Sequence, residues 1–244
     1  MKPFFPLVLL AFTLALGGCA LDPAEKAAVP QDPDAPIPVA LFEAGDALTE
    51  DWQKFDVWRN TAFRLVARDE AIAIRAEAEG ASGLLARRLE IDTEICPIIE
   101  WDWAVAALPS EADLSSRAAE DMAAAIFVVF GDPGVFSNPE PVPTLRYAWT
   151  TETDAPDKVV RSPYFPATLR TISVRSGPEG LGSVVTERRN LRADYDLAYG
   201  GTPEDDVEVI ALFIDSDHGE EPLTADFLGA RVLCSEDPGE PSIF

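Results

Sequence analysis

Alternating apolar and polar residues recur along most of the chain. In Ile99–Val105 every second residue is apolar, and two carboxylates, Glu100 and Asp102, fall on the opposite face. A period of two is typical of a strand that buries one face. Further segments with strand-like patterns are Phe63–Ala67, Ala71–Ala76, Leu84–Leu89, Leu145–Trp149, Leu169–Arg175, Val207–Ile214 and Thr224–Cys234. The pattern therefore predicts a chain that is mainly β-structure.

A few segments depart from simple alternation. Ala124–Phe130 is apolar on both faces, which predicts a strand in the middle of a sheet. Leu191–Tyr199 precedes two glycines and predicts a short helix, and Ser115–Met122 predicts another helix of a turn or two. Gly177–Gly180 has the composition of a hairpin turn. About ten strands separated by turns predict an all-β fold, an antiparallel and jelly-roll-like β-sandwich, built by residues 39–244 as a single domain.

The first 18 residues have the pattern of a secretory signal peptide. Lys2 precedes an apolar stretch, Phe4–Leu16, which is too short to span a bilayer because spanning takes about 20 residues. Two glycines then lead into Cys19, and this order resembles the lipobox at which bacterial lipoproteins are cut and lipidated. We predict that residues 1–18 are removed and that Cys19 carries lipid. The alternative is an ordinary secretory signal in which Cys19 has no role.

Residues 19–38 are predicted to form a tether. Five prolines interrupt this segment, and proline disfavours both helices and paired strands. Acyl chains on Cys19 would hold the protein at a membrane, since each buried methylene contributes about 0.8 kcal/mol. The residue after Cys19 is Ala20 and not aspartate, which favours the periplasmic side of the outer membrane in a Gram-negative bacterium.

The chain is strongly acidic. Its formal net charge of −24 becomes −25 when Lys2 is removed with the leader. This charge disfavours nucleic acid and anionic membrane surfaces as partners. A well-solvated surface is the simplest interpretation. The roughly 200 residues after the tether are enough to bury a core without a structural metal or disulfide.

Two cysteines remain after Cys19. Cys96 precedes one predicted strand and Cys234 closes the last, and an oxidising compartment permits a disulfide. The sequence leaves two alternatives open, a Cys96–Cys234 disulfide and two buried thiols that act as small apolar residues. The sequence contains no Cys-x-x-Cys motif and no cysteine–histidine cluster, which argues against structural zinc.

A series of motifs in fixed order extends through the predicted domain. Its members are Trp101-x-Trp103-x-Val105, Leu108-Pro109, Asp113, Asp121-Met122-Ala123, Tyr147-Ala148-Trp149, Arg170–Gly177, Glu187–Asn190, Asp194-Tyr195 and Asp215-Ser216-Asp217. In this series the chain resembles the bacterial family called domain of unknown function 3047. The resemblance covers nearly all of residues 39–244. It implies a secreted or envelope β-sandwich, similar in outline to carbohydrate-binding modules, with no assigned activity and no catalytic residues to carry over.

The chain departs from the family pattern at two places. Ser183-Val184 stands where tryptophan is frequent, and His218-Gly219 stands where Asn-Thr usually follows the Asp-x-Asp motif. Asp215 and Asp217, together with His218, are nevertheless candidate ligands for a metal or another molecule. Oxygen ligands at positions i and i+2 can bind calcium, the one candidate cofactor, when another loop completes the site. The alternative, which the pattern favours, is a solvated turn in which the Asp side chains cap backbone N–H groups.

Four further carboxylates are candidates for a binding surface. They are Glu100 and Asp102, which share a strand face, and Asp113 and Asp121. Charge on a solvated face is the simpler interpretation of all four. Catalysis is disfavoured because His218 is the only histidine, no G-x-S-x-G motif is present, and no pair of acids stands out among so many.

Aromatic residues fall into two groups. Those on apolar strand faces, such as Trp101 and Trp149, are expected in the core. Those outside the strand core include Trp52, Trp58, Tyr164 and Tyr195. Sugar-binding sandwiches stack pyranose rings on exposed aromatic side chains beside carboxylates, so we expect a non-catalytic module that binds a glycan or cell-wall polymer. Two alternatives stay open, a structural lipoprotein whose partner is another envelope protein, and a carboxylate-dependent hydrolase.

Overall fold

The structure is a computed structural model that describes residues 35–43, 48–49, 51–68, 70–135, 139–151 and 157–236. The described residues belong to one compact unit, Asp34–Phe244. The predicted signal peptide, the lipidation site Cys19 and most of the predicted tether lie outside the described residues. Within the described part of the chain, no helix combines the length and the apolar character needed to cross a membrane.

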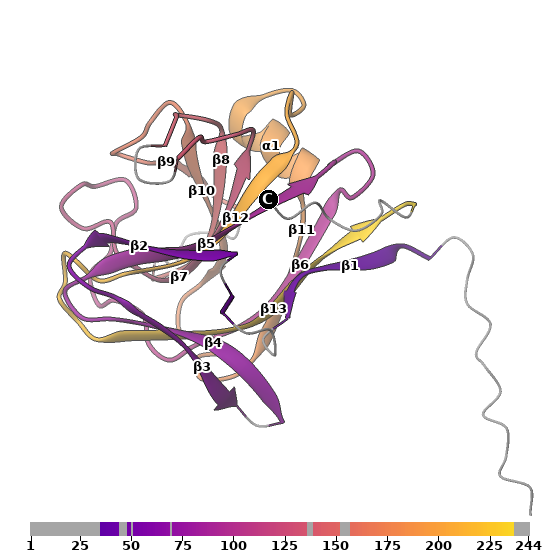
Figure 1. The fold of residues 1–244 in the computed structure, drawn as a ribbon. Coiled ribbons are helices and arrows are strands. Elements are labelled where there is room, and N and C mark those ends of the chain that lie inside the picture. Colours follow the sequence, from indigo (N-terminus) through magenta and orange to yellow (C-terminus); the bar gives the residue numbers. More distant parts are fainter. Residues whose placement is uncertain are drawn as a thin grey trace, which may run out of the picture. The chain divides into compact units, whose positions relative to one another are not determined.

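Two β-sheets form this unit (Figure 1). The first has the strand order β11-β6-β13-β4-β3, and β1 also pairs with β13. All of its described pairs are antiparallel. Its strands are β1 (Ile37–Glu43), β3 (Ala62–Arg68), β4 (Ala71–Ala78), β6 (Ile98–Val105), β11 (Val185–Asn190) and β13 (Leu223–Cys234).

The second sheet has the strand order β2-β5-β12-β7-β8-β10-β9. Its strands are β2 (Trp52–Trp58), β5 (Ser82–Ile91), β7 (Met122–Phe130), β8 (Thr144–Thr150), β9 (Val159–Arg161), β10 (Leu169–Ser176) and β12 (Val207–Asp215). The β8–β10 pair is parallel, while the other described pairs are antiparallel. The predicted all-β sandwich is confirmed, with this one parallel pair as a difference.

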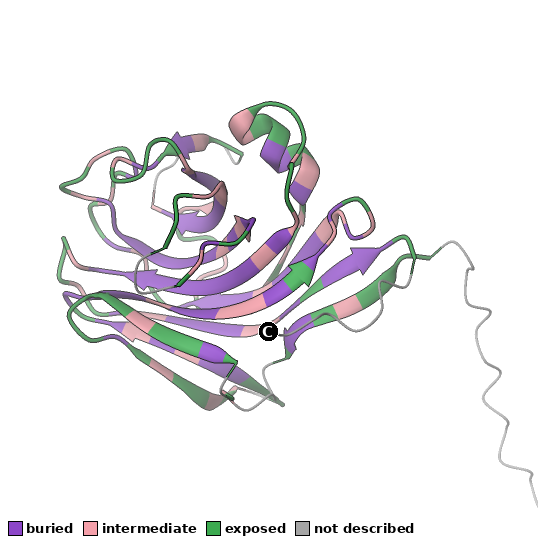
Figure 2. Cartoon of the chain, turned by 45° about the horizontal axis from the view of Figure 1, so that its top comes forward, coloured by how far each residue is buried: buried purple, intermediate pink, exposed green. Residues whose placement is uncertain are grey.

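The core lies between the two sheets, and its centre is aromatic. Trp101 of β6 stacks on Tyr147 of β8 with ring centroids 5.3 Å apart, and Trp103 lies 6.1 Å from Trp149. All four side chains are fully buried, and buried residues run along the strands of both sheets (Figure 2). The period-two pattern predicted this correctly, because alternate residues of a strand project to the same face.

The single described helix, α1 (Leu191–Tyr199), follows β11 directly. Its N-cap residue is Asn190, whose Oδ1 accepts a hydrogen bond from the backbone N of Ala193 at 3.0 Å. Gly200 ends it with a φ of 81°, a left-handed conformation that suits glycine. The helix predicted at Ser115–Met122 is wrong. That segment forms turns, because Asp113 Oδ1 accepts a hydrogen bond from the backbone N of Ser115, and because β7 already begins at Met122.

Four other expectations need correction. β1 begins at Ile37, two residues inside the predicted tether, and it includes Pro38, which an edge strand tolerates because a partner is needed on one side alone. Trp52 is buried in β2, where it packs edge to face against Phe42 at 5.5 Å. Tyr195 on α1 is buried as well. The turn at residues 177–180 does not close a hairpin, since β10 and β11 belong to different sheets.

A disulfide joins Cys96 and Cys234, with an Sγ–Sγ distance of 2.07 Å. Of the two alternatives for these cysteines, the structure has the covalent one. Cys96 lies in the turn before β6, and Cys234 ends β13 beside the start of β1. The bond therefore closes one end of the six-stranded sheet across 138 residues of sequence.

Candidate functional site

The outer face of the seven-stranded sheet, which points away from the main core, carries a second set of buried and partly buried apolar side chains. On the central strands β7 and β12, Phe127 and Phe213 pack edge to face with ring centroids 5.1 Å apart. Leu114, from the segment before β7, and Val160 of β9 belong to the same cluster. Segments outside the central strands thus cover part of this face, and a cavity lies beside them.

This cavity has a volume of about 420 Å³, within the usual range for ligand pockets. Three largely exposed aromatic side chains line it: Trp58 at the end of β2, and Tyr164 and Phe165 in the segment after β9. Their exposed fractions are 55%, 42% and 62%. Exposing a large apolar side chain to water costs free energy. A ligand that covered these three aromatic side chains would therefore be stabilised.

A buried ion pair forms part of the lining. Arg146 of β8 and Glu120, just before β7, are both buried, and an Arg146 Nη2 atom donates to the Glu120 carboxylate. Arg146 Nε also donates to Thr171 Oγ1 at 2.8 Å. Buried charges are costly unless they are paired and hydrogen-bonded, and both conditions hold here. The pair gives the cavity fixed polar groups beside its aromatic ones.

Asp215, at the end of β12, lines the same cavity and is 7% exposed. Burial and, after it, the negative charge of Asp217 raise the pKa of Asp215 to about 9. The backbone N of Asp217 donates a long hydrogen bond of 3.3 Å to Asp215 Oδ1. The Asp215 carboxyl group therefore carries a proton at neutral pH and can act as a hydrogen-bond donor.

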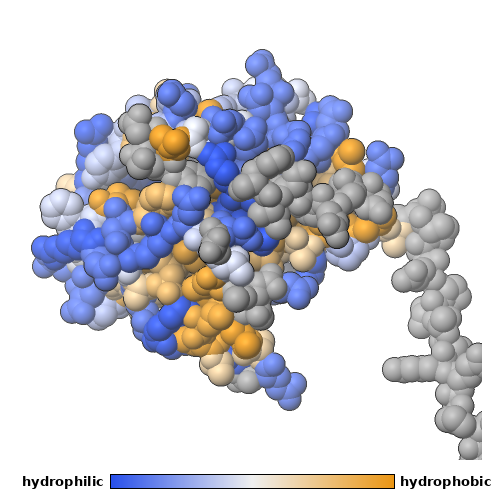
Figure 3. All heavy atoms as spheres, viewed as in Figure 1, coloured by the Kyte–Doolittle hydropathy of each residue, from blue (hydrophilic) through white to orange (hydrophobic). Residues whose placement is uncertain are grey.

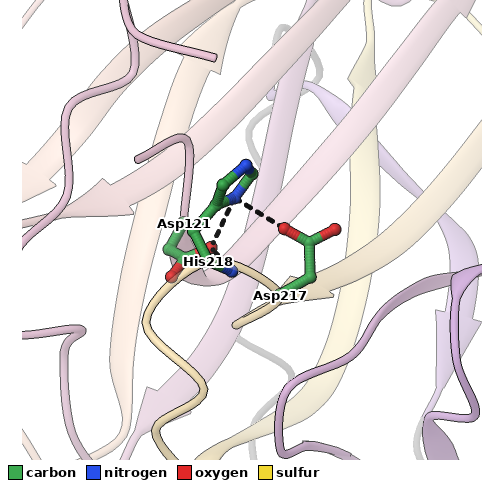
Figure 4. A group of neighbouring side chains, drawn as sticks. All are labelled: Asp121, Asp217 and His218. Atoms are coloured by element: carbon green, nitrogen blue, oxygen red, sulfur yellow. Dashed lines mark hydrogen bonds and ion pairs between the residues drawn. The ribbon is translucent and has the colours of Figure 1, made fainter. Parts of the chain in front are cut away.

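Asp121 lies against the turn that contains Asp217 and His218 (Figure 4). Asp121 Oδ1 accepts a hydrogen bond from the backbone N of His218 at 3.1 Å, and Asp121 Oδ2 accepts one from the backbone N of Gly219 at 2.7 Å. The antiparallel pairing of β7 with β12 places Asp121 at this end of the sheet. The buried Asp121 carboxylate thus fixes the turn after β12.

The His218 ring bridges the turn and the segment after β9. Its Nδ1 lies 3.2 Å from Asp121 Oδ1 and 2.6 Å from Asp217 Oδ1, and its Nε2 lies 3.3 Å from Tyr164 Oη. The Tyr164 hydroxyl donates to the carbonyl oxygen of Arg117 at 2.8 Å. A carboxylate-rich end of the cavity is thereby connected to one of its exposed aromatic residues.

The structure places the other predicted residues elsewhere. Glu100 lies on the outer face of the six-stranded sheet, where it pairs with Arg188 at 2.5 Å and Arg231 at 2.6 Å. Asp102, on the same face, accepts a hydrogen bond from Thr186. Asp113 caps its own turn, and hydrogen bonds from the Ser115 side chain and backbone lower the pKa of Asp113. None of these three lines this cavity, and Asp102 lines a separate one on the six-stranded sheet.

Sequence reasoning missed several contributors to the cavity, among them Glu120, Arg146 and Phe165. The sequence pattern did not point to Arg146, because a polar residue between apolar ones is usual in a strand that buries one face. Glu120 is directly followed by Asp121, and this acidic pair before an apolar strand was the one signal available. Trp58 and Tyr164 were singled out as aromatic residues outside the core, and both line the cavity.

Exposed apolar residues also occur away from the cavity. Leu65 of β3 and Ile72 of β4 are 40% and 44% exposed. Hydrophobic side chains gather in the part of Figure 3 where Figure 1 places β3, β4 and β13. Nothing else among the described residues indicates what would cover this surface.

The family comparison agrees with the motif series. The family model described as "Protein of unknown function (DUF3047)" matches residues 50–229. The chain belongs to this family. All the residues that line the cavity fall inside the matched DUF3047 region. Among curated proteins, none matches the sequence.

Solved structures match this DUF3047 protein at very low identity and with low TM-scores. The Emp47p carbohydrate recognition domain is 10% identical with a TM-score of 0.43, and the match covers 84% of this chain and 99% of that one. The K3 cleaved adhesin domain of Lys-gingipain from Porphyromonas gingivalis is 10% identical with a TM-score of 0.38, covering 80% and 99%. The enzymatically active domain of tailspike protein 4 from bacteriophage CBA120 is 8% identical with a TM-score of 0.39. That match covers 75% of this chain and 19% of the tailspike chain.

Proposed function

We propose that this protein is a non-catalytic binding module of the bacterial envelope, held at the outer membrane by lipid on Cys19, and that it binds a glycan or cell-wall polymer. The observation that carries the proposal is the cavity on the outer face of the seven-stranded sheet. There, three exposed aromatic side chains stand beside fixed polar groups. The sequence features at residues 1–38 support the location.

Sugars match this lining chemically. A pyranose ring has an apolar C–H face that can stack on Trp58 or Phe165, and its hydroxyl groups both donate and accept hydrogen bonds. Asp215 and Asp217 supply a donor and acceptors, and Ser82 and Ser162 line the same cavity. The net charge of −24 disfavours a polyanionic ligand, so a neutral glycan fits best.

A glycan array probed with the full chain in detergent tests the proposal. We expect selective binding that Trp58→Ala weakens at least about tenfold, which corresponds to about 1.4 kcal/mol. Leu197→Ala is the matched control, because Leu197 is 56% exposed on α1 and does not line the cavity. An array without signal, or equal losses in the two variants, contradicts the proposal.

The hydrolase alternative predicts a different outcome in the same assay. If the carboxyl groups cleaved the ligand, a bound oligosaccharide would be shortened during incubation. We expect its length, measured by mass spectrometry, to stay unchanged. Shortened products that disappear in the Asp217→Asn variant would favour hydrolysis over simple binding.

A further inference from the structure

Three potential metal ligands converge at the carboxylate-rich end of the cavity. Asp121 precedes β7, and Asp217 and His218 lie in the turn after β12. One ligand atom from each residue lies within 4.8 Å of the other two. Figure 4 shows both carboxylates directed at the same ring nitrogen, Nδ1 of His218.

The hydrogen bonds around His218 define which ring nitrogen carries a proton. A tyrosine hydroxyl has one proton to give, and Tyr164 gives it to the carbonyl oxygen of Arg117 at 2.8 Å. Tyr164 Oη must then accept from His218 Nε2, which lies 3.3 Å away. Nε2 therefore carries a proton, and the lone pair of Nδ1 faces two carboxylate oxygens.

Nδ1 and the two carboxylate oxygens need a proton or a metal ion between them, since their lone pairs would otherwise face one another. A single proton on Nδ1 can form a good hydrogen bond to one of the two carboxylates but not to both. Asp121 Oδ1 has hydrogen-bond geometry toward Nδ1, whereas the buried atom Asp217 Oδ1 has no hydrogen-bond partner, although it lies only 2.6 Å from Nδ1. A metal ion satisfies all three ligand atoms at once.

We propose that Asp121, Asp217 and His218 bind a divalent first-row transition-metal ion such as Zn²⁺ or Mn²⁺. Imidazole with two carboxylates suits these ions better than Ca²⁺, which takes six to eight oxygen ligands. Two ligands of a tetrahedral ion at bonds near 2.05 Å are about 3.3 Å apart, close to the 3.2 Å between Nδ1 and Asp121 Oδ1. Asp217 Oδ1 needs to move outward by about 0.7 Å to reach that spacing.

The surrounding contacts resemble the outer shell of a metal site. Ser82 Oγ donates to Asp217 Oδ2 at 2.9 Å, so that Asp217 Oδ1 is left for the ion. The backbone N of Gly219 donates to Asp121 Oδ2 at 2.7 Å. Nε2 of His218 is held by Tyr164, as the second nitrogen of metal-bound histidines usually is held. Because Asp217 and His218 line the cavity, a fourth coordination position is available to water or a ligand.

The test uses the full chain in detergent, without a histidine tag and after treatment with EDTA. Isothermal titration with Zn²⁺, Mn²⁺ and Ca²⁺ gives stoichiometry and affinity. Because the chain has a single histidine, imidazole NMR signals report this site alone. We expect one equivalent of Zn²⁺ to shift the Nδ1 resonance of His218 strongly, and Mn²⁺ to broaden the ring signals.

Two variants and one control decide the outcome. Asp217→Asn and His218→Asn should each weaken Zn²⁺ binding by about 10- to 100-fold or more, since even outer-shell changes have effects of that size. Glu220→Gln, which alters an exposed acid in the same turn, should leave the affinity unchanged. No stoichiometric binding, unchanged His218 resonances, or equal losses in all three variants would overturn the proposal.

This proposal stands apart from the glycan proposal, because the metal titration is done without any glycan. Loss of metal binding in His218→Asn with an unchanged glycan array would show that metal binding and glycan binding are independent. An array without signal would leave the metal proposal unaffected. A titration without binding would leave the glycan proposal unaffected, because that proposal rests on the exposed aromatic side chains of the cavity.

Discussion

The carboxylate of Asp121 accepts a hydrogen bond from the backbone N of His218, 97 residues further along the chain, at 3.1 Å. Asp121 is buried and also holds the backbone N of Gly219. A buried carboxylate just before one strand thereby fixes the turn that follows its neighbour, and this contact shapes one end of the cavity.

Asp121→Ala should therefore destabilise the protein. The change removes both hydrogen bonds and leaves two N–H groups without their partner, which predicts a loss of about 2–4 kcal/mol in the free energy of unfolding. Urea denaturation followed by tryptophan fluorescence measures it. Asp113→Ala is the control, because Asp113 is a poorly buried turn acid, and its loss should be about 1 kcal/mol or less. Equal losses would argue against a special role for Asp121.

The Cys96–Cys234 disulfide should contribute strongly to stability. It closes a loop with a sequence separation of 138 residues, and restricting so long a loop in the unfolded chain predicts about 2–5 kcal/mol. The double variant Cys96→Ala, Cys234→Ala should lose this amount in urea denaturation. Adding a reductant should lower the stability of the wild type and leave the double variant unchanged. If the reductant also lowered the stability of the double variant, the effect would not come from the Cys96–Cys234 disulfide.

The stability contribution of Asp226 should depend on pH. Asp226 of β13 is 2% exposed, and it accepts hydrogen bonds from Arg75 Nε at 2.6 Å and Arg68 Nη1 at 2.6 Å. Burial raises the pKa of Asp226, but the bonds from Arg75 and Arg68 outweigh it and hold that pKa below its ordinary value of 3.8. A carboxylate of this kind adds stability that is complete above its unfolded pKa and disappears as pH falls through its folded pKa.

Asp226→Asn should accordingly lower the free energy of unfolding at neutral pH by about 1–3 kcal/mol. The difference from the wild type should stay constant down to about pH 5 and shrink below about pH 4. Urea denaturation across this pH range measures it. Glu77→Gln, which removes an exposed partner of Arg64, should cost under about 1 kcal/mol. A difference between Asp226→Asn and wild type that grows at low pH would contradict the assignment.

Cys19→Ala should release the protein from the membrane. If lipid on Cys19 is the anchor, the variant should no longer incorporate radiolabelled palmitate and should move from the membrane to the soluble periplasmic fraction. Cys96→Ala, which leaves the predicted lipobox intact, is the matched control and should still be labelled. Membrane association of Cys19→Ala that equals the wild type would reject the anchor.

Some of the candidate site could be anticipated from the sequence. Trp58, Tyr164, Asp217 and His218 were visible as polar or aromatic residues outside the strand core. Their convergence was not visible, because it depends on the pairing of β7 with β12 and on the course of the chain after β9. Arg146 and Glu120 became part of the cavity for the same reason, since a single strand does not reveal which partners its polar face meets.

The sequence by itself determined the strands that bury one face, the aromatic core residues Trp101 and Trp149, and the helix between Asn190 and Gly200. These follow from local periodicity and capping, which act within a few residues. Only the tertiary structure decided that Trp52 is buried, that Cys96 meets Cys234, and that Asp121 reaches the turn at His218. Such contacts join residues far apart in the chain, and the register of strand pairing, which no local pattern contains, selects them.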